Sequence, residues 1–179
     1  TMRLPLNRFT LIGATTKLSL LSAPLRDRFG HTYNLNFYET ADIGKIIERN
    51  ATKLGTDLEK NAVNLIAERS RRTPRIANRL LKRLRDVAEI EGGGTLSVAI
   101  AEKGLDLLAI DAMGLDDIDR LLLRTLIEKF NGGPSGVNTL AAAIAEETDT
   151  IETVYEPYLL QIGFLERTPR GRKATPAAY

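Results

Sequence analysis

The spacing of apolar positions changes near residue 40, from the short alternation typical of strands to the longer period typical of helices. The run Phe9–Gly13 is compact, β-prone and bounded by polar residues, which predicts a buried strand. Tyr33–Tyr38 alternates apolar with polar side chains and predicts a second short strand. Two such fragments cannot build a sheet core alone, so we expect their partner strands in sequence beyond these 179 residues.

Four helices are predicted between residues 40 and 108, the second over about 58–70 and the fourth over about 97–108. Thr40 is a good N-cap for the first helix. The clearest start is that of the third, where Thr73 precedes Pro74, because proline at the first helical position loses no hydrogen bond. The expected inward positions, which predict a small helical bundle, are Ile43, Ile46, Ile47, Ala51, Leu54, Ala62, Val63, Ile66, Ala67, Ile76, Leu80, Leu84 and Val87.

A new structural unit is predicted from Gly114 onward. An amphipathic helix over 115–130 is followed by a short Ala-rich helix over 139–145 and by a third helix that ends near residue 162. Two short runs then flank Thr168-Pro169-Arg170-Gly171, which is typical of a hairpin with a turn at its tip. Three helices followed by a basic hairpin predict a winged helix.

Composition narrows the function classes. Hydrophobic residues make up 43% and charged residues 27%, the sequence contains no Cys and one His, and the net charge is +2. Disulfide frameworks, thiol nucleophiles and zinc clusters are therefore excluded, and we expect no metal ligands in this chain. The chain has no apolar run approaching the roughly 20 residues that span a bilayer, and no signal-peptide pattern, so we expect a cytoplasmic protein with no membrane partner.

Positive charge is zoned, which points to phosphate-bearing partners. Residues 69–85 hold eight cations and no acid, and 167–173 are basic as well. By contrast, the acidic run Asp116-Asp117-x-Asp119 stands at a predicted helix start, where capping and the helix dipole explain it without a metal.

Two arginines are candidates for nucleotide chemistry. Arg28 could stabilise charge on a transferring phosphoryl group, or it could be a surface residue paired with Asp27. Arg75 falls in the first turn of a predicted helix, which is unfavourable for a cation unless an anion lies nearby. A solvated arginine on a basic helix is the alternative. Thr15-Thr16 ends the first predicted strand, at the position where α/β sheets bind ligands.

The predicted hairpin carries four cations, Arg167, Arg170, Arg172 and Lys173, with no acid after Glu166. Cations on both arms and at the tip could contact a DNA backbone and give salt-dependent affinity with little base preference. A solubilising turn, or a winged helix that binds protein, remains open as the alternative.

In their order, these motifs resemble the RuvB family, hexameric AAA+ motors that drive Holliday-junction branch migration. The resemblance runs over nearly the whole chain, with Lys17 standing where the family usually has Arg. It rests on Phe9-Thr-Leu-Ile-Gly-Ala-Thr-Thr16, Ala23-Pro-Leu-Arg-Asp-Arg-Phe-Gly30, Phe37-Tyr38, Arg71-x-Thr-Pro-Arg-Ile-Ala-Asn-Arg-Leu-Leu81, Leu126-Ile-Glu-Lys-Phe130, Thr139-Leu-Ala-Ala-Ala143, Glu156-Pro-Tyr-Leu-Leu160 and Gly163-Phe-Leu-Glu-Arg-Thr-Pro-Arg-Gly-Arg172.

The resemblance implies a role for individual residues. Thr16 would be sensor 1, Arg28 an arginine finger that acts on the nucleotide of an adjacent subunit, and Arg75 sensor 2, while Tyr38 would line the nucleotide pocket. Arg167 and Arg172 would contact DNA on the wing, and Arg170 and Lys173 are candidates beside them.

The resemblance also implies cofactors and partners. The intact protein would use ATP and Mg²⁺ and form a homo-hexamer on double-stranded DNA at Holliday junctions. It would work with RuvA and with RuvC as part of the resolving complex. No Gly-x-x-x-x-Gly-Lys-Ser/Thr phosphate loop and no acidic Mg²⁺ motif occur here, so we expect these and the RuvA-binding hairpin to precede residue 1. This chain alone would then neither hydrolyse ATP nor bind RuvA well.

The implied fold class is mainly α. It would comprise a remnant of an AAA+ α/β sheet at 1–38, a four-helix AAA+ lid domain at 39–113 and a C-terminal winged-helix domain at 114–179. Two other hypotheses stay open. One is a non-enzymatic winged-helix DNA-binding protein in which Arg28 and Arg75 are dispensable. The other is a different AAA+ relative, such as a clamp loader or replication initiator, whose C-terminal domain should lack the wing hairpin.

Overall fold

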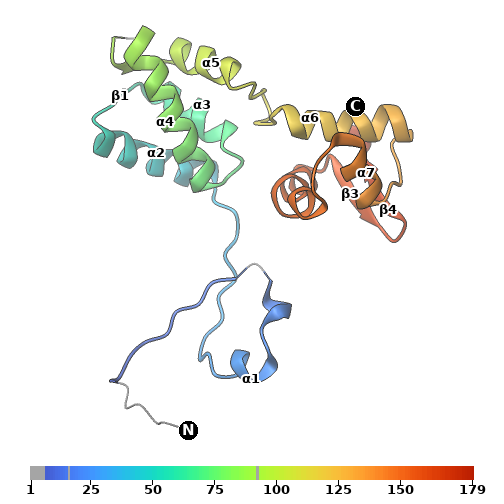
Figure 1. Cartoon of the computed structure of the whole chain (residues 1–179). Coiled ribbons are helices and arrows are strands. Elements are labelled where there is room, and N and C mark those ends of the chain that lie inside the picture. The colour runs from blue at the N-terminus through green and yellow to red at the C-terminus, as the bar shows by residue number, and fades with distance from the viewer. Residues whose placement is uncertain (1–6, 16, 92) are drawn as a thin grey trace. The chain divides into compact units, whose positions relative to one another are not determined.

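The computed structural model describes residues 7–15, 17–91 and 93–179. The chain divides into two units, Thr1–Asn36 and Phe37–Tyr179. In the described part of the first unit, the only regular elements are the 3₁₀ turn η1 (Leu18–Leu20) and the short helix α1 (Ala23–Arg26). These are drawn in blue in Figure 1.

Both strands predicted near the N-terminus are absent. Residues 7–15 and 33–38 have no strand structure, and Phe9, Leu11 and Ile12 are exposed, Ile12 by 88%. A strand is held by backbone hydrogen bonds to a neighbour and by burial of one face. No described segment pairs with either run as a neighbouring strand, so the strand predictions were wrong for this chain.

Four helices form the first half of the second unit. The helical spacing of apolar residues in these segments explains why they are helical and which face they bury. They are α2 (Thr40–Leu54), α3 (Lys60–Arg69), α4 (Pro74–Glu91) and α5 (Val98–Leu107). Two-residue strands β1 (Asp57–Leu58) and β2 (Thr95–Leu96) pair in parallel beside them. Figure 1 shows the helices packed against one another. Their shared core contains Ile43, Ile47, Ala51, Ala62, Val63, Ile66, Ala67, Leu80 and Leu84, as the apolar pattern predicted.

The boundaries of these helices follow local chemistry. Helix α4 begins at Pro74, as predicted, where the missing proline N–H breaks no helical hydrogen bond. Helix α2 begins at Thr40 with Glu39 in the N-cap position, one residue earlier than predicted. It ends at Gly55, which takes the left-handed conformation (φ 66°) usual after a helix.

The second half has the helix order and hairpin of a winged helix. Helix α6 (Asp117–Arg124) continues into the π-helical segment η2 (Thr125–Lys129), and α7 (Val137–Ile144) follows. A third helical stretch is made of α8 (Thr148–Thr150), η3 (Ile151–Tyr155) and α9 (Glu156–Gln161). A separate core holds them together, including Leu122, Leu126, Leu140, Ile144, Ile151, Tyr158, Leu159, Leu165 and Ala174.

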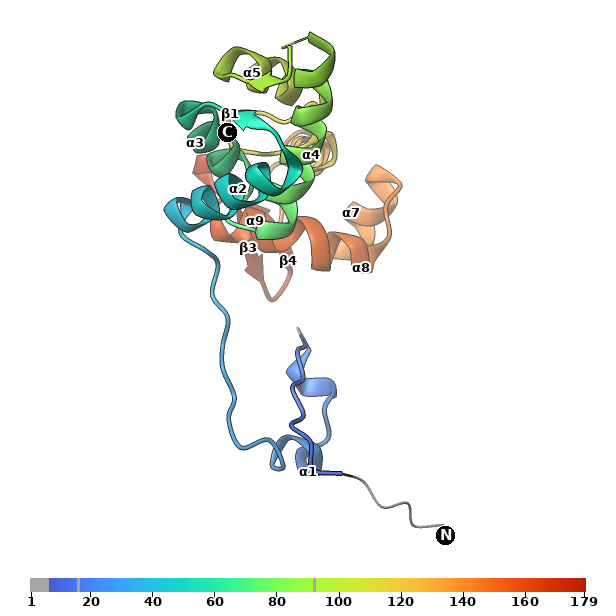
Figure 2. The same cartoon turned by 90° about the vertical axis from the view of Figure 1, so that its left-hand side faces the viewer.

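The wing is the antiparallel hairpin of β3 (Leu165–Thr168) and β4 (Gly171–Ala174), as predicted, and η4 (Pro176–Ala178) follows it in the chain. Figure 2 shows the hairpin next to α9. Its register pairs Arg167 with Arg172 and Glu166 with Lys173. Because side chains alternate across a strand, Arg167 and Arg172 share the face of the buried Leu165 and Ala174. None of the described helices is both long enough and apolar enough to cross a membrane.

Candidate nucleotide- and DNA-contacting residues

Arg28 follows the short helix α1 in the N-terminal unit. Its side chain is exposed, and it forms no ion pair or hydrogen bond with the described residues, Asp27 included. Thr16, the predicted sensor 1 residue, lies outside the described residues. An exposed and unpaired guanidinium suits binding to an anion brought by another molecule.

Tyr38 and Arg75 stand on adjoining segments of the C-terminal unit. Arg75 is exposed in the first turn of α4 and has no charged partner among the described residues. Tyr38 is tied to the same helix start by Arg72, whose Nε donates to the Tyr38 carbonyl at 2.8 Å. The Tyr38 N–H donates in return to the Arg72 carbonyl at 3.3 Å. Tyr38 and Arg75, the two residues predicted to line the nucleotide pocket, therefore lie on either side of the hydrogen-bonded contact between the start of α2 and the start of α4.

Sequence reasoning placed Arg71 in the motif at this turn but assigned it no role. Its backbone takes a left-handed conformation (φ 53°), and its side chain is buried. The guanidinium reaches the winged-helix half, where Nε donates to the Gly114 carbonyl at 2.7 Å and both terminal nitrogens contact Asp119. It also lies 5.2 Å from the ring centre of Tyr158. Arg71 thus fastens the turn before α4 to the start of α6.

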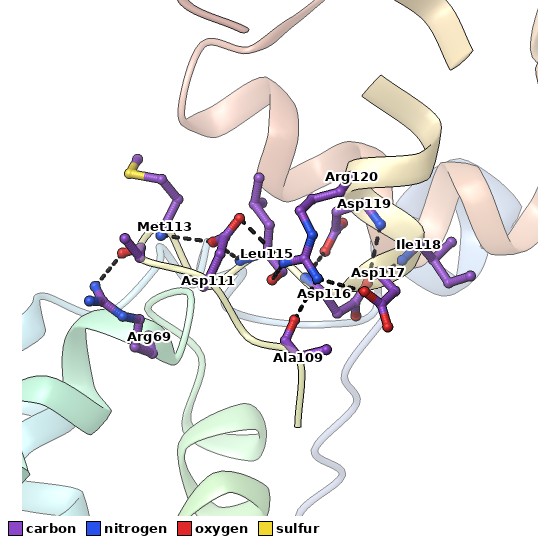
Figure 3. A network of polar contacts seen from close by, with 12 residues as sticks. Arg69, Ala109, Asp111, Met113, Leu115, Asp116, Asp117, Ile118, Asp119 and Arg120 are labelled. Atoms are coloured by element: carbon purple, nitrogen blue, oxygen red, sulfur yellow. Dashed lines mark hydrogen bonds and ion pairs between the residues drawn. The ribbon is translucent and has the colours of Figure 1, made fainter. Parts of the chain in front are cut away.

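The segment 109–120 on the other side of this contact is itself closely hydrogen-bonded (Figure 3). Asp116 and Asp119 form the capping box of α6, as the sequence suggested for this acidic run. Arg120 donates to the carbonyls of Leu115 and Ala109, both at 2.8 Å, and Arg69 donates to the Ala112 carbonyl. We call Arg71, Asp116 and Asp119 with this surrounding network the joint cluster.

Two acids share the single guanidinium of Arg71, and one of them is buried. Asp119 is fully buried, and Asp116 approaches the same guanidinium at 3.4 Å. Burial raises the pKa of Asp119 to about 6, and the Arg71 charge opposes that rise without cancelling it. Asp119 therefore accepts a proton more easily than an ordinary aspartate does.

The four predicted wing cations have different surroundings. Glu156, the first residue of α9, is fully buried and accepts from Arg167 Nε at 2.7 Å and from Arg167 Nη2 at 2.8 Å. Arg172 donates to the same carboxylate at 3.0 and 3.1 Å, and its Nη2 donates to Glu152 at 2.6 Å. We call Glu152, Glu156, Arg167 and Arg172 the wing cluster.

Exposure separates the cations further. The Arg172 side chain is only 14% exposed, whereas that of Arg167 is 54% exposed. Arg170 at the turn and Lys173 on the outer face are exposed and have no ion pair among the described residues. The structure therefore leaves three cations accessible for a phosphate backbone and commits most of Arg172 to the interior.

Glu156 has the opposite ionisation to Asp119. Burial alone raises the pKa of Glu156, but hydrogen bonds from Arg167 and Arg172 outweigh burial and hold its pKa below the usual value. Sequence reasoning missed this acid, although a signal existed. Glu156 lies between the inward positions Tyr155 and Leu159 of an apolar helix face, where a carboxylate needs a basic partner.

No group of three or more His, Asp or Glu side chains that could hold a metal ion occurs in the part of the chain that the structure describes.

Comparison with known protein families gives one consistent result along the chain. The model of the Holliday junction DNA helicase RuvB P-loop domain matches residues 1–35, and that of the RuvB AAA lid domain matches 38–111. The model of the RuvB C-terminal winged helix domain matches 112–179. The chain belongs to the RuvB family.

Individual relatives agree with this assignment. The Holliday junction branch migration complex subunit RuvB of Dehalococcoides mccartyi is 57% identical over 178 residues, which are 99% of this chain and 51% of that protein. The corresponding subunit of Thermomicrobium roseum is 60% identical over 99% of this chain and 50% of its own length. The chain thus spans about half the length of the curated relatives it matches.

Solved structures confirm the fold. A point mutant of Thermotoga maritima RuvB superposes with a TM-score of 0.87 at 50% identity, over 93% of this chain and 56% of that one. The Thermotoga maritima RuvB Holliday junction branch migration motor gives 0.84 at 49% identity, over 90% of this chain and 54% of that one. The predicted mainly α fold class, with its lid and winged helix, is confirmed. The wing hairpin also argues against an AAA+ relative that lacks one.

Proposed function

We propose that this chain supplies the lid and DNA-binding part of an ATP-dependent motor that drives branch migration of Holliday junctions in recombination and repair. The observation that carries the proposal is the unbroken order of three RuvB-specific matches, over 1–35, 38–111 and 112–179. Its working divisions are an ATPase segment at 1–38, a lid at 39–113 and a winged helix at 114–179.

On the nucleotide side, Arg28 acts as an arginine finger on the nucleotide of the adjacent subunit, Thr16 as sensor 1 and Arg75 as sensor 2, with Tyr38 lining the pocket. The exposed and unpaired state of Arg28 and Arg75 among the described residues supports this role. ATP and Mg²⁺ are the cofactors of the intact motor. Their phosphate-loop and Mg²⁺ ligands are not among these 179 residues, so the chain by itself does not hydrolyse ATP.

On the DNA side, Arg167, Arg170 and Lys173 contact the phosphates of double-stranded DNA at the junction. Arg172 supports them from within, because its guanidinium is largely buried against Glu152 and Glu156. The intact protein forms a homo-hexamer in the cytoplasm, binds RuvA through a region outside this chain, and works beside RuvC in the resolving complex as a helicase of the SOS response.

The test of the nucleotide roles uses the intact motor that contains these residues. Replacing Arg28 by Ala should lower the rate of ATP hydrolysis by about 10³-fold or more, because a finger stabilises the charge of the transferring phosphoryl group. Arg26→Ala is the matched control, since Arg26 is an equally exposed neighbour. Mixing Arg28→Ala subunits with subunits disabled in the phosphate loop should restore part of the activity, as a finger that acts between subunits requires.

Wild-type hydrolysis by the Arg28→Ala and Arg75→Ala motors, combined with loss of DNA binding on removal of the wing cations, would contradict the proposal. That pattern would show that Arg28 and Arg75 are dispensable for hydrolysis, and it would leave DNA binding by the wing as the function of this chain. ATP hydrolysis by the purified 179-residue chain that Arg28→Ala abolishes would count against the assignment of the phosphate ligands to other residues.

A further inference from the structure

The two arms of the wing meet on a single carboxylate. Arg167 on β3 and Arg172 on β4 are partners across the hairpin, and each places its Nε–Nη2 edge on Glu156. The Glu156 side chain is fully buried, with 0% of it accessible to solvent. One buried acid at the start of α9 therefore orients both arginines of the hairpin.

The two arginines are left in different states by this contact. Arg172 has a second acid, Glu152, on its Nη2 and is 14% exposed. Its backbone also exchanges hydrogen bonds with Ser135 at 2.7 and 2.8 Å, which fastens β4 to the segment before α7. Arg167 contacts only Glu156, remains 54% exposed, and its Nη1 forms no hydrogen bond or ion pair with the described residues.

We propose that Glu156 is a positioning residue for DNA binding, which holds one edge of Arg167 and leaves the Nη1 amino group directed to a backbone phosphate. This inference rests on the proposed DNA-binding function and assigns a role within it. The positive charge of Arg172 offsets the negative charge of Glu156, so that this buried carboxylate does not repel the phosphate that Arg167 contacts.

The physical advantage is preorganisation. A free arginine loses side-chain entropy when a phosphate immobilises it, whereas an arginine already held by a bidentate carboxylate loses little. A phosphate oxygen can accept from the free Nη1 while Glu156 keeps the other edge, because the guanidinium offers five N–H donors in a fixed plane. The cost is a carboxylate near the DNA, and this cost makes the idea testable, since simple electrostatics predicts the opposite mutational effect.

The experiment measures affinity of the full 179-residue chain for a fluorescent DNA duplex as a function of salt. Glu156→Gln should weaken binding by about 3- to 10-fold and lower the slope of log K against log salt by about 1, as loss of one phosphate contact requires. Glu152→Gln is the matched control, because it removes the same charge from the same cluster, but the Glu152 carboxylate pairs with Arg172 and forms no hydrogen bond with Arg167 among the described residues. That variant should bind as tightly as wild type or more tightly. Thermal unfolding monitors the fold of each variant.

Arg167→Lys tests the same point without altering the buried acid. It keeps the charge at a half-exposed site but cannot share one planar group between Glu156 and a phosphate. Its affinity should fall about as far as that of Glu156→Gln, and the double variant should lose no more than either single one.

Three outcomes would overturn the inference: wild-type or tighter binding by a folded Glu156→Gln protein, equal weakening by Glu152→Gln, or wild-type binding by Arg167→Lys. The first would show that Glu156 competes with DNA for the arginine. Failure of the wild-type chain to bind DNA at all is a different result, which removes the proposed function of the wing itself.

Discussion

The joint cluster and the wing cluster are both built from carboxylates and arginines, but they differ in which partner is shared. In the joint cluster, the single base Arg71 is shared by Asp116 and Asp119. In the wing cluster, the buried acid Glu156 is shared by two arginines. Both central acids are fully buried, yet the pKa of Asp119 is raised to about 6 while that of Glu156 is lowered. Burial therefore does not decide the ionisation by itself: at Asp119 one arginine is opposed by burial and by Asp116, whereas at Glu156 two arginines outweigh burial.

The joint cluster and the wing cluster also have different structural roles. The joint cluster connects the turn before α4, which carries the proposed sensor Arg75, to the start of the winged helix. The wing cluster orders the proposed DNA-contacting hairpin on α9. One cluster is a connection between two halves of the unit, and the other shapes a surface.

Removing the base of the joint cluster should have the largest effect on stability. Arg71→Ala leaves Asp119 buried without its main partner and should lower the free energy of unfolding by about 3–5 kcal/mol at pH 7.5. Urea unfolding followed by circular dichroism measures this change. The loss should be smaller at pH 5, where Asp119 takes up a proton.

Arg72→Ala is the control for that experiment. Arg72 has the same left-handed backbone (φ 53°) but pairs with Glu39, whose side chain is 76% exposed. Its removal should cost no more than about 1 kcal/mol. Equal losses for the two variants would show that the joint cluster contributes no more than a surface ion pair.

A pair of glycines compares backbone packing in the same two regions. Gly114 at the joint and Gly163 before the wing both have φ 75°, but a Cβ at Gly114 would lie 2.7 Å from the Arg69 carbonyl oxygen, whereas one at Gly163 would meet open space. Gly163→Ala should cost about 1 kcal/mol from the left-handed backbone. Gly114→Ala should cost about 2–4 kcal/mol, since overpacking adds to that strain. Thermal unfolding of both variants measures the difference. Equal costs would mean that the backbone around Gly114 adjusts to the added Cβ without further loss of stability.

The two acids should respond to pH in opposite directions. The contribution of Asp119, whose folded pKa is raised, is complete below pH 3.8 and is lost as pH rises through about 6, a change of about 2–3 kcal/mol. The contribution of Glu156, whose folded pKa is lowered, is present above pH 4.5 and is lost as pH falls through the lowered value.

Unfolding at pH 3–8 of wild type, Asp119→Asn and Glu156→Gln measures both responses. Asp119→Asn should flatten the loss between pH 3.8 and about 6, and Glu156→Gln should remove part of the loss in acid. Parallel pH curves for the two variants would contradict the opposite pKa shifts of Asp119 and Glu156.

Several elements could be predicted from local sequence because local physics controls them. The start of α4 at Pro74, the inward faces of α2 and α3, the capping box at Asp116 and the hairpin turn before Gly171 depend on residues within a few positions of one another. The N-terminal strands failed because a strand is stable only with a partner, and no described segment pairs with residues 9–13 or 33–38.

The candidate site divides in the same way. The sequence by itself determined the family, the order of lid and winged helix, and the presence of exposed cations such as Arg28, Arg75 and Arg170. Only the tertiary structure decided that Arg71 is buried at the joint and that Arg172 faces Glu156. Those contacts link residues 48 and 16 positions apart, and which acid meets which base follows from how the helices and the hairpin pack, which local spacing does not contain.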